Sequence, residues 1–344
     1  MNKITVNIND SILRVLKVMD KAGIGFLTVL DQQEKVVGVL TDGDIRRGFI
    51  KGYQLDDTVS CFLNREFYYL VEDNIDLKKF GEYRTRRLRA VPLLSKERKL
   101  LRIYDFTTTK SILPVDAVIM AGGLGSRLRP LTNDTPKPLL KIGGKEIIAY
   151  NFDRLHQYGI ENQHITVKYL AEQIEEFCNN YPSDINFSLV YEKEYMGTAG
   201  ALSLIDDFKN DTILLMNSDL LTNIDYEDFY RSFIEKDADI MVASIPYDVS
   251  LPYAIFDTHE REVLSFKEKP NFTYYANAGL YLIKKEVLEL IPKETLFNAT
   301  DLLDKVIAND KKLIHYPIRG YWLDIGKHKD FDKAMRDIAH INWD

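Results

Sequence analysis

Residues 115–132, Val-Asp-Ala-Val-Ile-Met-Ala-Gly-Gly-Leu-Gly-Ser-Arg-Leu-Arg-Pro-Leu-Thr, decide the fold of the larger part of the chain. The first six residues are nearly all apolar, which is typical of a strand that is buried on both faces of a parallel sheet. Three glycines follow within the next five residues, and without a Cβ their backbone N–H groups can approach an anion closely. Arg127, and Lys137 in the Pro-Lys-Pro that follows, supply positive charge for a polyphosphate. The segment therefore predicts a phosphate-binding loop at the carboxyl end of a buried strand.

This loop differs from the two commonest phosphate-binding motifs. It lacks the Gly-Lys-Ser/Thr that closes a Walker A loop, and the third glycine of a Gly-x-Gly-x-x-Gly fingerprint would fall at Leu128. A glycine-rich turn with incidental basic residues is the alternative interpretation. The loop alone therefore does not name a ligand.

Short apolar runs recur beyond the loop, at 213–216 and 280–283, and helical patterns at 171–178 and 226–235 lie among them. Strands that alternate with helices predict an α/β domain with a mixed, mainly parallel sheet and helices on both faces. Right-handed crossovers then place the functional loops at the carboxyl ends of the strands.

Composition limits the class of protein. The 344 residues are 45% hydrophobic and 28% charged, so the chain can bury a full core, and its length favours two domains. A net charge of −7 does not favour a nucleic-acid partner. Two cysteines, Cys61 and Cys178, are too few for a disulfide framework. We see no signal peptide and no apolar run long enough for a membrane span, which predicts a cytoplasmic protein with no membrane partner.

Five further motifs follow the glycine loop in a fixed order. They are Glu192 with Met196-Gly197-Thr198-Ala-Gly-Ala-Leu202, Asn217-Ser218-Asp219, Phe266-Lys-Glu268-Lys269-Pro270, Asn277-Ala-Gly279-Leu-Tyr281 and Trp322-Leu-Asp324-Ile-Gly326. With the loop, this series resembles the sugar-1-phosphate nucleotidyltransferases, the enzymes that make nucleotide-diphosphate sugars. One departure is Ser218, which stands where the family usually has glycine in its metal motif.

The resemblance implies a Rossmann-like catalytic domain in which a sugar-1-phosphate attacks the α-phosphorus of a nucleoside triphosphate and releases pyrophosphate. Because both reactants are anions, a Mg²⁺ ion held by Asp219 and Asp324 would offset their repulsion. Arg127 would stabilise charge on the pyrophosphate, and Lys137 would hold the triphosphate. These four residues are the expected catalytic set.

The resemblance also assigns binding residues. The nucleotide would contact Ala121, Gly122, Gly123, Leu124, Gly125, Glu192, Gly197 and Thr198. The sugar phosphate would contact Glu268, Lys269, Asn277 and Gly279, with Lys269 on the phosphate and Glu268 and Asn277 on sugar hydroxyls.

Glu192 bears on the choice of base. Pyrimidine-preferring members of the family tend to carry glutamine at this position, and an amide suits the imide edge of uracil or thymine. A carboxylate only accepts hydrogen bonds, which suits the N1–H and N2–H groups of guanine. This chemistry favours GTP. The alternative is that Glu192 only caps a turn or pairs with Lys193.

The N-terminal residues predict a smaller α/β pattern. Residues 11–21 carry a helical apolar stripe, and apolar runs at 26–30 and 36–40 predict a hairpin. Runs at 91–94 and 100–104 repeat that pair, which predicts an internal repeat of roughly fifty residues. The basic run at 84–89 is either a solvated face or a phosphate-contacting strip.

The segment Gly38-Val-Leu-Thr41-Asp-Gly-Asp44 resembles the ligand motif of cystathionine-β-synthase-type (CBS) modules. The resemblance implies a tandem pair of modules over 1–110, ahead of the catalytic domain at 111–344, with Thr41 and Asp44 contacting an adenine nucleotide. The second copy, Leu101-Arg-Ile-Tyr-Asp105, lacks the glycine and threonine of the motif. Ligand sensing and dimerisation both remain open, and a homo-oligomer is expected.

Among CBS-fused members, the chain resembles the glucosamine-1-phosphate guanylyltransferases of bacterial legionaminic-acid biosynthesis, whose product is GDP-glucosamine. The alternatives are mannose-1-phosphate guanylyltransferase, a relative that uses another sugar, a non-catalytic CBS nucleotide sensor, and a carbohydrate-binding scaffold. The intact set of Arg127, Lys137, Asp219 and Asp324 favours an enzyme.

Overall fold

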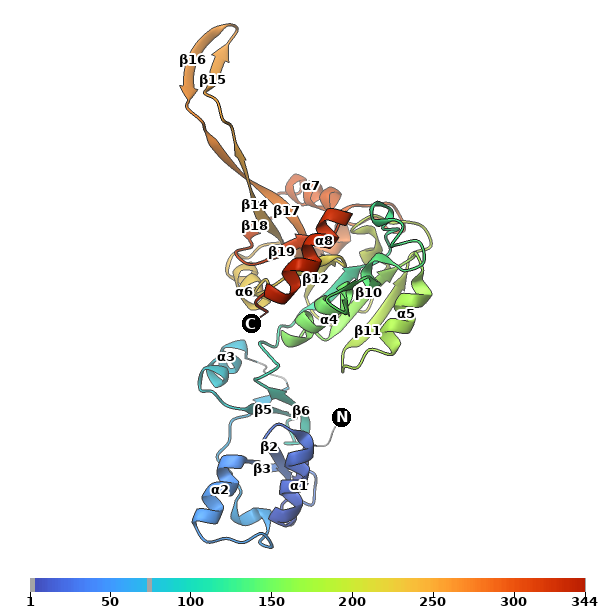
Figure 1. Ribbon diagram of the computed structural model, residues 1–344. Helices are drawn as coiled ribbons and strands as arrows, with labels where there is room; N and C mark the ends of the chain where they lie inside the picture. Colours follow the sequence, from blue (N-terminus) through green and yellow to red (C-terminus); the bar gives the residue numbers. More distant parts are fainter. Residues whose placement is uncertain (1–3, 73–75, 344) are drawn as a thin grey trace. The chain divides into compact units, whose positions relative to one another are not determined.

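The computed structural model describes residues 4–72 and 76–343 (Figure 1). The chain forms two compact units that divide between Ile112 and Leu113, and the sequence predicted the division two residues earlier. None of the helices in the described ranges is both long enough and apolar enough to cross a membrane.

The smaller unit contains one strand pattern twice. Its first sheet has the order β1-β2-β3 and its second β4-β5-β6; in each, the first pair is parallel and the second antiparallel. The elements are β1 (Thr5–Asn7), α1 (Ile12–Ala22), β2 (Phe26–Leu30), β3 (Val36–Thr41), α2 (Asp42–Ile50), η1 (Val59–Cys61), β4 (Leu70–Val71), α3 (Leu77–Thr85), β5 (Ala90–Leu94) and β6 (Leu100–Asp105). The internal repeat is therefore present.

The spacing of the repeat is longer than predicted, since Phe26 of β2 corresponds to Ala90 of β5, 64 positions later. The difference lies in the connection after α2, which runs through η1 before the second copy begins. Helix α1 begins and ends as its sequence signals indicate: the Ser11 hydroxyl caps its first turn and Gly23 ends it with a φ of 71°.

The larger unit is built on a seven-stranded sheet with the order β11-β10-β7-β12-β17-β14-β18. The strands are β7 (Asp116–Met120), β10 (Asn162–Val167), β11 (Asn186–Tyr191), β12 (Thr212–Asn217), β14 (Ile240–Ser250), β17 (Asn271–Lys284) and β18 (Leu313–Pro317). Every pair is parallel except the two that involve β17. The predicted α/β class with a mixed, mainly parallel sheet is confirmed.

Both faces of this sheet are covered, because successive residues along its central strands are buried alternately on each side. Val118 of β7 and Leu215 of β12 belong to one core cluster with Leu302 and Val306 of α7 (Ala299–Ala308), while their neighbours on the other face, such as Leu214, are also fully buried.

The other helices of the larger unit are α4 (Ile147–Gln157), α5 (Ala171–Asn179), α6 (Tyr226–Glu235) and α8 (His328–Asp337). Its short 3-10 helices are η2 (Ser126–Leu128), η3 (Lys137–Leu139), η4 (Gly200–Leu204), η5 (Lys285–Leu290) and η6 (Ile338–His340).

Small strand pairs lie outside the main sheet. They are β8 (Lys141–Ile142) with β9 (Lys145–Glu146), β13 (Leu220–Thr222) with β19 (Trp322–Asp324), and β15 (Ile255–His259) with β16 (Glu262–Lys267). The β13–β19 pair joins two motifs that are far apart in the sequence.

A long two-stranded projection, here called the arm, comprises residues 246–275 (Figure 1). The outer parts of β14 and β17 form its base, with Pro246 opposite Tyr275, and the hairpin β15–β16 forms its outer end. Where the arm leaves the sheet, Ala243 alone opposes Ala278 to Leu280, so β17 carries a bulge there. The sequence did not predict this projection.

Asp116 at the start of β7 organises one edge of the fold. It is fully buried and accepts hydrogen bonds from the Lys209 N (2.5 Å), Asn210 N (3.0 Å), Asn210 Nδ2 (2.7 Å) and Asn162 Nδ2 (3.0 Å) atoms. Replacing Asp116 with alanine leaves these partly buried donors without their acceptor. We expect the free energy of unfolding to fall by about 3–5 kcal/mol, measured by urea denaturation.

The comparison for this change is Asn162→Ala, which removes one of the four hydrogen bonds to Asp116 and the longer one (3.4 Å) that Asn186 Nδ2 donates to Asn162 Oδ1. It should cost about 1 kcal/mol. A loss below that value for Asp116→Ala would contradict the structural role of the carboxylate.

Candidate active site

The glycine loop directly follows β7 and is held in a tight turn. Gly125 has a φ of 60°, and a Cβ built on it would lie 3.0 Å from Thr132 Cγ2 and 3.1 Å from Lys137 Cβ. The Thr132 hydroxyl donates a hydrogen bond of 2.9 Å to the Gly125 carbonyl oxygen. A side chain at this left-handed position would be strained and would have to displace Thr132 and Lys137 slightly, so glycine is favoured. The Gly125 backbone and Lys137 therefore lie close together.

A cleft of about 740 Å³ lies at this end of the sheet, beside the carboxyl ends of β7, β10 and β12. Its wall includes all eight residues that the sequence assigned to the nucleotide: Ala121, Gly122, Gly123, Leu124, Gly125, Glu192, Gly197 and Thr198. Arg127, Lys137 and Asp219 also lie on the wall. The structure therefore brings together in one cavity residues that are up to about a hundred positions apart in sequence.

Asp219 and Asp324 meet through the small β13–β19 pair. Leu220 is directly opposite Asp324, and the Ile325 N–H donates a hydrogen bond of 3.1 Å to the Asp219 carbonyl oxygen. The Lys137 ammonium forms an ion pair with the Asp219 carboxylate, and both side chains are largely buried. The two carboxylates are thus neighbours beside one cation.

The electrostatics of this pair fit a bound divalent metal ion. Burial, and then the negative charge of Asp219, raise the pKa of Asp324 to about 6. Within the described ranges, the Oδ1 atoms of Asp219 and Asp324 are both buried and accept no hydrogen bond. No group of three or more His, Cys, Asp or Glu side chains gathers at one point in this part of the chain. A pair of carboxylates suits Mg²⁺, which commonly takes one or two carboxylates together with substrate phosphates.

Arg127 lies at the mouth of the cleft. Its side chain is exposed, and its Nη1 and Nη2 atoms are 3.6 Å from the position that a Cβ on Gly326 would occupy. Gly326 thus leaves room for the guanidinium near the segment that follows Asp324. Arg127 thus adds a second positive charge, besides that of Lys137, to the cleft wall.

Glu192 is fixed between two parts of the cleft wall and is only 7% exposed. Its Oε2 atom accepts a hydrogen bond of 3.0 Å from the Met196 N–H, and its Oε1 atom is 2.8 Å from the position of a Cβ on Gly122. Glu192 therefore caps the turn with one oxygen and presents the other toward the glycine loop.

Two of the four residues assigned to the sugar phosphate lie next to the cleft. Gly279 is in the bulge of β17 with a φ of 71°, and a Cβ on it would lie 2.6 Å from Nδ2 of Asn217, a residue of the cleft wall. The Asn277 side chain accepts a hydrogen bond from the Gly279 N–H (2.9 Å) and donates one to the Tyr281 hydroxyl (2.8 Å). Asn277 thus orders the bulge.

The other two, Glu268 and Lys269, are not brought to the cleft. Both are exposed and lie in the middle of the arm, between β16 and β17. The paired β14 and β17 strands keep this segment away from Asn277: an extended strand rises about 3.3 Å per residue, so Pro270 and Asn277 are about 23 Å apart along it. The structure thus places Glu268 and Lys269 apart from Asn277 and Gly279, and their assignment to the sugar phosphate stays a prediction.

Sequence reasoning missed Lys168, Tyr169 and Tyr195, which also line the cleft. The Lys168 ammonium donates a hydrogen bond of 2.5 Å to the Lys193 carbonyl oxygen and lies 3.7 Å from Glu194. Lys168 directly follows β10, so the rule that functional residues follow the carboxyl ends of parallel strands would have found it.

Thr41 and Asp44 of the smaller unit form the capping box of α2. The Thr41 hydroxyl donates to Asp44 Oδ2 (2.6 Å), and Asp44 Oδ1 accepts from the Arg47 guanidinium (2.5 Å). Asp44 also lines a cavity of about 310 Å³ with Arg47, Lys51 and Asn64. Both predicted ligand residues are thus used locally to begin a helix.

The basic run at 84–89 is largely held by protein partners. Arg84 binds the Lys110 carbonyl oxygen, Arg86 donates to the Tyr68 hydroxyl at 2.6 Å, and Arg89 lies 3.8 Å from Asp105. These contacts favour the reading of the run as a structural, solvated face.

Comparisons with known families match both units. The family model described as "Nucleotidyl transferase" matches residues 116–341, and the model described as "CBS domain" matches residues 1–51. The second strand pattern of the smaller unit lies beyond the CBS match.

Among curated relatives, a mannose-1-phosphate guanyltransferase beta-A of Xenopus laevis is 29% identical over 228 residues, covering 64% of this chain and 63% of that protein. A glucose-1-phosphate adenylyltransferase of Bacillus thuringiensis is 31% identical over 252 residues, covering 64% of this chain and 67% of that protein. The chain thus spans less than two thirds of the length of the guanyltransferase.

Among solved structures, HddC from Yersinia pseudotuberculosis complexed with GMP-PN is 27% identical, with a TM-score of 0.51 over 65% of this chain and 99% of that one. A putative glucose-1-phosphate thymidylyltransferase from Bacillus anthracis in complex with a sucrose is 25% identical, with a TM-score of 0.54 over 67% of this chain and 97% of that one. The larger unit therefore has the fold of these proteins.

Proposed function

The chain belongs to the nucleotidyl transferase family, and from that premise we propose that it transfers a nucleotidyl group from a nucleoside triphosphate to a sugar-1-phosphate. The observation that carries the proposal is the meeting of the glycine loop, Lys137 and Asp219 in one cleft, with Asp324 next to Asp219 through the β13–β19 pair. The sugar-1-phosphate oxygen attacks the α-phosphorus, the bond to the β-phosphate oxygen breaks, and pyrophosphate leaves. No covalent enzyme intermediate is needed.

The charge of each cleft residue determines its proposed role. The backbone N–H groups of the glycine loop hold the triphosphate, and Lys137 places a buried positive charge beside it. Arg127, at the mouth, stabilises the negative charge that builds on the departing pyrophosphate. Asp219 and Asp324 would hold Mg²⁺, which when bound neutralises phosphate charge and favours the attack.

For the base we propose guanine. The Oε1 atom of Glu192 faces the glycine loop, and a carboxylate oxygen there accepts from the N1–H or N2–H of guanine. The names of several relatives, which are mannose-1-phosphate guanyltransferases, and the GMP-PN in a related structure support a guanine nucleotide.

For the sugar we propose glucosamine-1-phosphate, giving GDP-glucosamine for legionaminic-acid synthesis. This proposal rests on the resemblance of the CBS-fused chain to that group of enzymes. Mannose-1-phosphate is the second candidate, favoured by the names of the relatives. An adenine nucleotide at the CBS module remains a further proposal. It would have to compete with the Thr41–Asp44 capping box.

The experiment that tests the proposal is a matrix of GTP, ATP, UTP, CTP and dTTP against glucosamine-, mannose- and glucose-1-phosphate with the full chain. Pyrophosphate release gives the rate, and the mass of the product identifies the nucleotide sugar. We expect GTP with glucosamine-1-phosphate to give the highest kcat/KM. Absence of pyrophosphate release with every pair would contradict the proposed activity.

Replacing Glu192 with glutamine should change the base preference. The amide oxygen would keep the bond to the Met196 N–H, so the NH₂ group would face the N1–H of guanine, donor against donor. We expect kcat/KM for GTP to fall about 10- to 100-fold while that for UTP rises, as measured in the same matrix.

Glu194→Gln is the matched control, because Glu194 is a near neighbour whose side chain is 96% exposed. It should leave the ratio of GTP to UTP turnover within about twofold. If Glu192→Gln left the ratio of GTP to UTP turnover unchanged, Glu192 would only cap the turn at Met196 and would not contact the base.

A further inference from the structure

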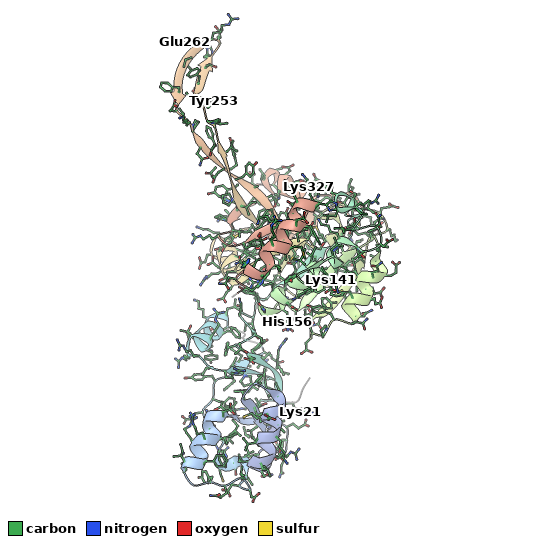
Figure 2. All side chains as sticks on the ribbon, in the orientation of Figure 1. Lys21, Lys141, His156, Tyr253, Glu262 and Lys327 are labelled. Carbon is green, nitrogen blue, oxygen red and sulfur yellow. The ribbon has the colours of Figure 1, made fainter. Side chains whose placement is uncertain are left out.

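The arm carries an unusual concentration of exposed apolar side chains. Of the 24 large apolar residues that are exposed in the described part of the chain, nine lie in the arm. They are Tyr247, Tyr253, Ile255, Phe256, Val263, Leu264, Phe266, Tyr274 and Tyr275. Figure 2 shows Tyr253 and Glu262 on this ribbon, away from the body of the larger unit. A patch of this kind marks an interaction surface.

The apolar side chains are arranged as cross-strand pairs. Tyr247 is directly opposite Tyr274, and Phe256 is opposite Phe266, with ring centroids 6.5 Å apart and an edge-to-face angle of 84°. Opposite residues of an antiparallel pair lie on one face of the ribbon. Each pair therefore presents two adjoining aromatic rings on a single face, which suits packing against another flat surface.

The arm also has open backbone edges. Within the described ranges, β15 and β16 pair only with each other, so each has one edge without a partner strand. A two-stranded ribbon is marginally stable in water unless another strand or layer covers it. Long, apolar, unpaired edges are also the usual template for association with another chain.

The charges of the arm favour a second copy of the same chain as that partner. The outer segment 257–262 carries three acids and one arginine, a net charge of −2, whereas Lys267 and Lys269 with Glu268 give the middle segment a net charge of +1. Two arms that lie antiparallel about a two-fold axis place the acidic end of each beside the basic middle of the other.

The exposed area of the arm matches a small dimer interface. Six of the nine side chains are aromatic and at least 54% exposed. Tyr274 and Tyr275 are consecutive in β17 and point to opposite faces of the ribbon, so one packing face does not cover both. At about 150–250 Å² per aromatic side chain, covering the four rings of the two cross-strand pairs removes roughly 370–600 Å² from each copy, the size of a small interface between two proteins. We propose that the arm is a dimerisation element that packs its aromatic face against the arm of a second copy of this chain.

The first test is the oligomeric state of the full chain by sedimentation velocity across a concentration series. The double variant Phe256→Ser, Phe266→Ser should raise the dimer dissociation constant by about 100-fold or more. The matched control is Ile234→Ser, Ile307→Ser, which removes two residues of similar exposure (54% and 59%) from α6 and α7. It should leave the constant unchanged. A monomeric wild-type chain, or equal effects of both double variants, would overturn the proposal.

The second test uses the charges. Glu262→Lys and Lys267→Glu should each weaken the dimer about tenfold, and the combined swap should restore it, because the proposed antiparallel arrangement puts the acidic outer segment of one arm beside the basic middle segment of the other. Additive weakening in the combined variant would contradict the antiparallel arrangement.

A third measurement is specific to the arm, so that association through the smaller unit cannot imitate the result. Amide hydrogen exchange in residues 255–267 should slow at least tenfold as the protein concentration rises through the dimer range. Exchange that is fast and independent of concentration in a dimeric chain would place the dimer contact elsewhere and overturn the proposal. None of these measurements depends on the proposed enzymatic activity.

Discussion

Replacing Asp219 with asparagine is expected to lower kcat/KM for pyrophosphate release by at least about 1,000-fold. The amide keeps the shape of the side chain but removes the charge that pairs with Lys137 and that would hold Mg²⁺ with Asp324. The apparent affinity for Mg²⁺ should fall in the same variant, since an amide oxygen is a weaker ligand than a carboxylate. Both are measured by a coupled pyrophosphate assay at increasing Mg²⁺ concentration.

The control for this change is Asp207→Asn, at a surface aspartate whose side chain is 69% exposed. It should retain activity within about twofold. Thermal unfolding of both variants should resemble the wild type, because asparagine is nearly isosteric with aspartate. If Asp219→Asn kept more than a tenth of the wild-type activity, Asp219 would not be a metal ligand, and the central part of the proposed mechanism would be contradicted.

The second large effect is expected for Lys137→Met, which keeps the length of the side chain and removes its charge. Lys137 is 12% exposed and forms the ion pair with Asp219 beside Asp324, so its loss leaves two buried carboxylates without their neighbouring cation. We expect kcat/KM to fall about 100- to 1,000-fold, with a higher KM for the nucleoside triphosphate.

Lys141→Met serves as the control, because Lys141 is four residues further along and 64% exposed. Its activity should match the wild type. The double variant Lys137→Met, Asp219→Asn should lose less than the product of the single losses, since the two side chains act on each other. A fully multiplicative loss would mean that the ion pair has no part in the catalytic arrangement.

Much of the cleft could be predicted from the sequence because its residues follow strands directly. The run 115–120 has the unbroken apolar pattern of a buried strand, so the glycine loop after it had to lie at the carboxyl edge of the sheet. Asn217 ends a second strand of the same kind, β12, and Asp219 follows it. Parallel neighbours bring these ends together whatever their separation in the chain.

The position of Glu268 and Lys269 could not be predicted in this way. The strands on either side of them, β16 and the outer part of β17, are exposed on both faces, so their apolar residues give no periodic pattern that a core would impose. Phe256, Leu264 and Phe266 are apolar yet at least 60% exposed, and nothing in the sequence distinguishes them from core residues. Their exposure is a property of the three-dimensional arrangement.

The orientation of β17 was also beyond the sequence. The run 280–283 has the composition of a parallel core strand, yet β17 is antiparallel to both neighbours. The reason is its connection: the chain leaves β14 and returns through the arm without a crossover helix, and such a return can only run antiparallel. Length and composition do not distinguish this hairpin from a pair of separate strands.

The bulge at Gly279 lies between the base of the arm and the wall of the cleft. The backbone bends at this bulge, at the base of the arm. A Cβ on Gly279 would lie 2.6 Å from Asn217 Nδ2, so the same residue also borders the cleft wall. A substitution that straightened the bend would redirect the projecting ribbon and reshape the pocket in one step. The base of the arm and the wall of the cleft thus depend on one residue, Gly279.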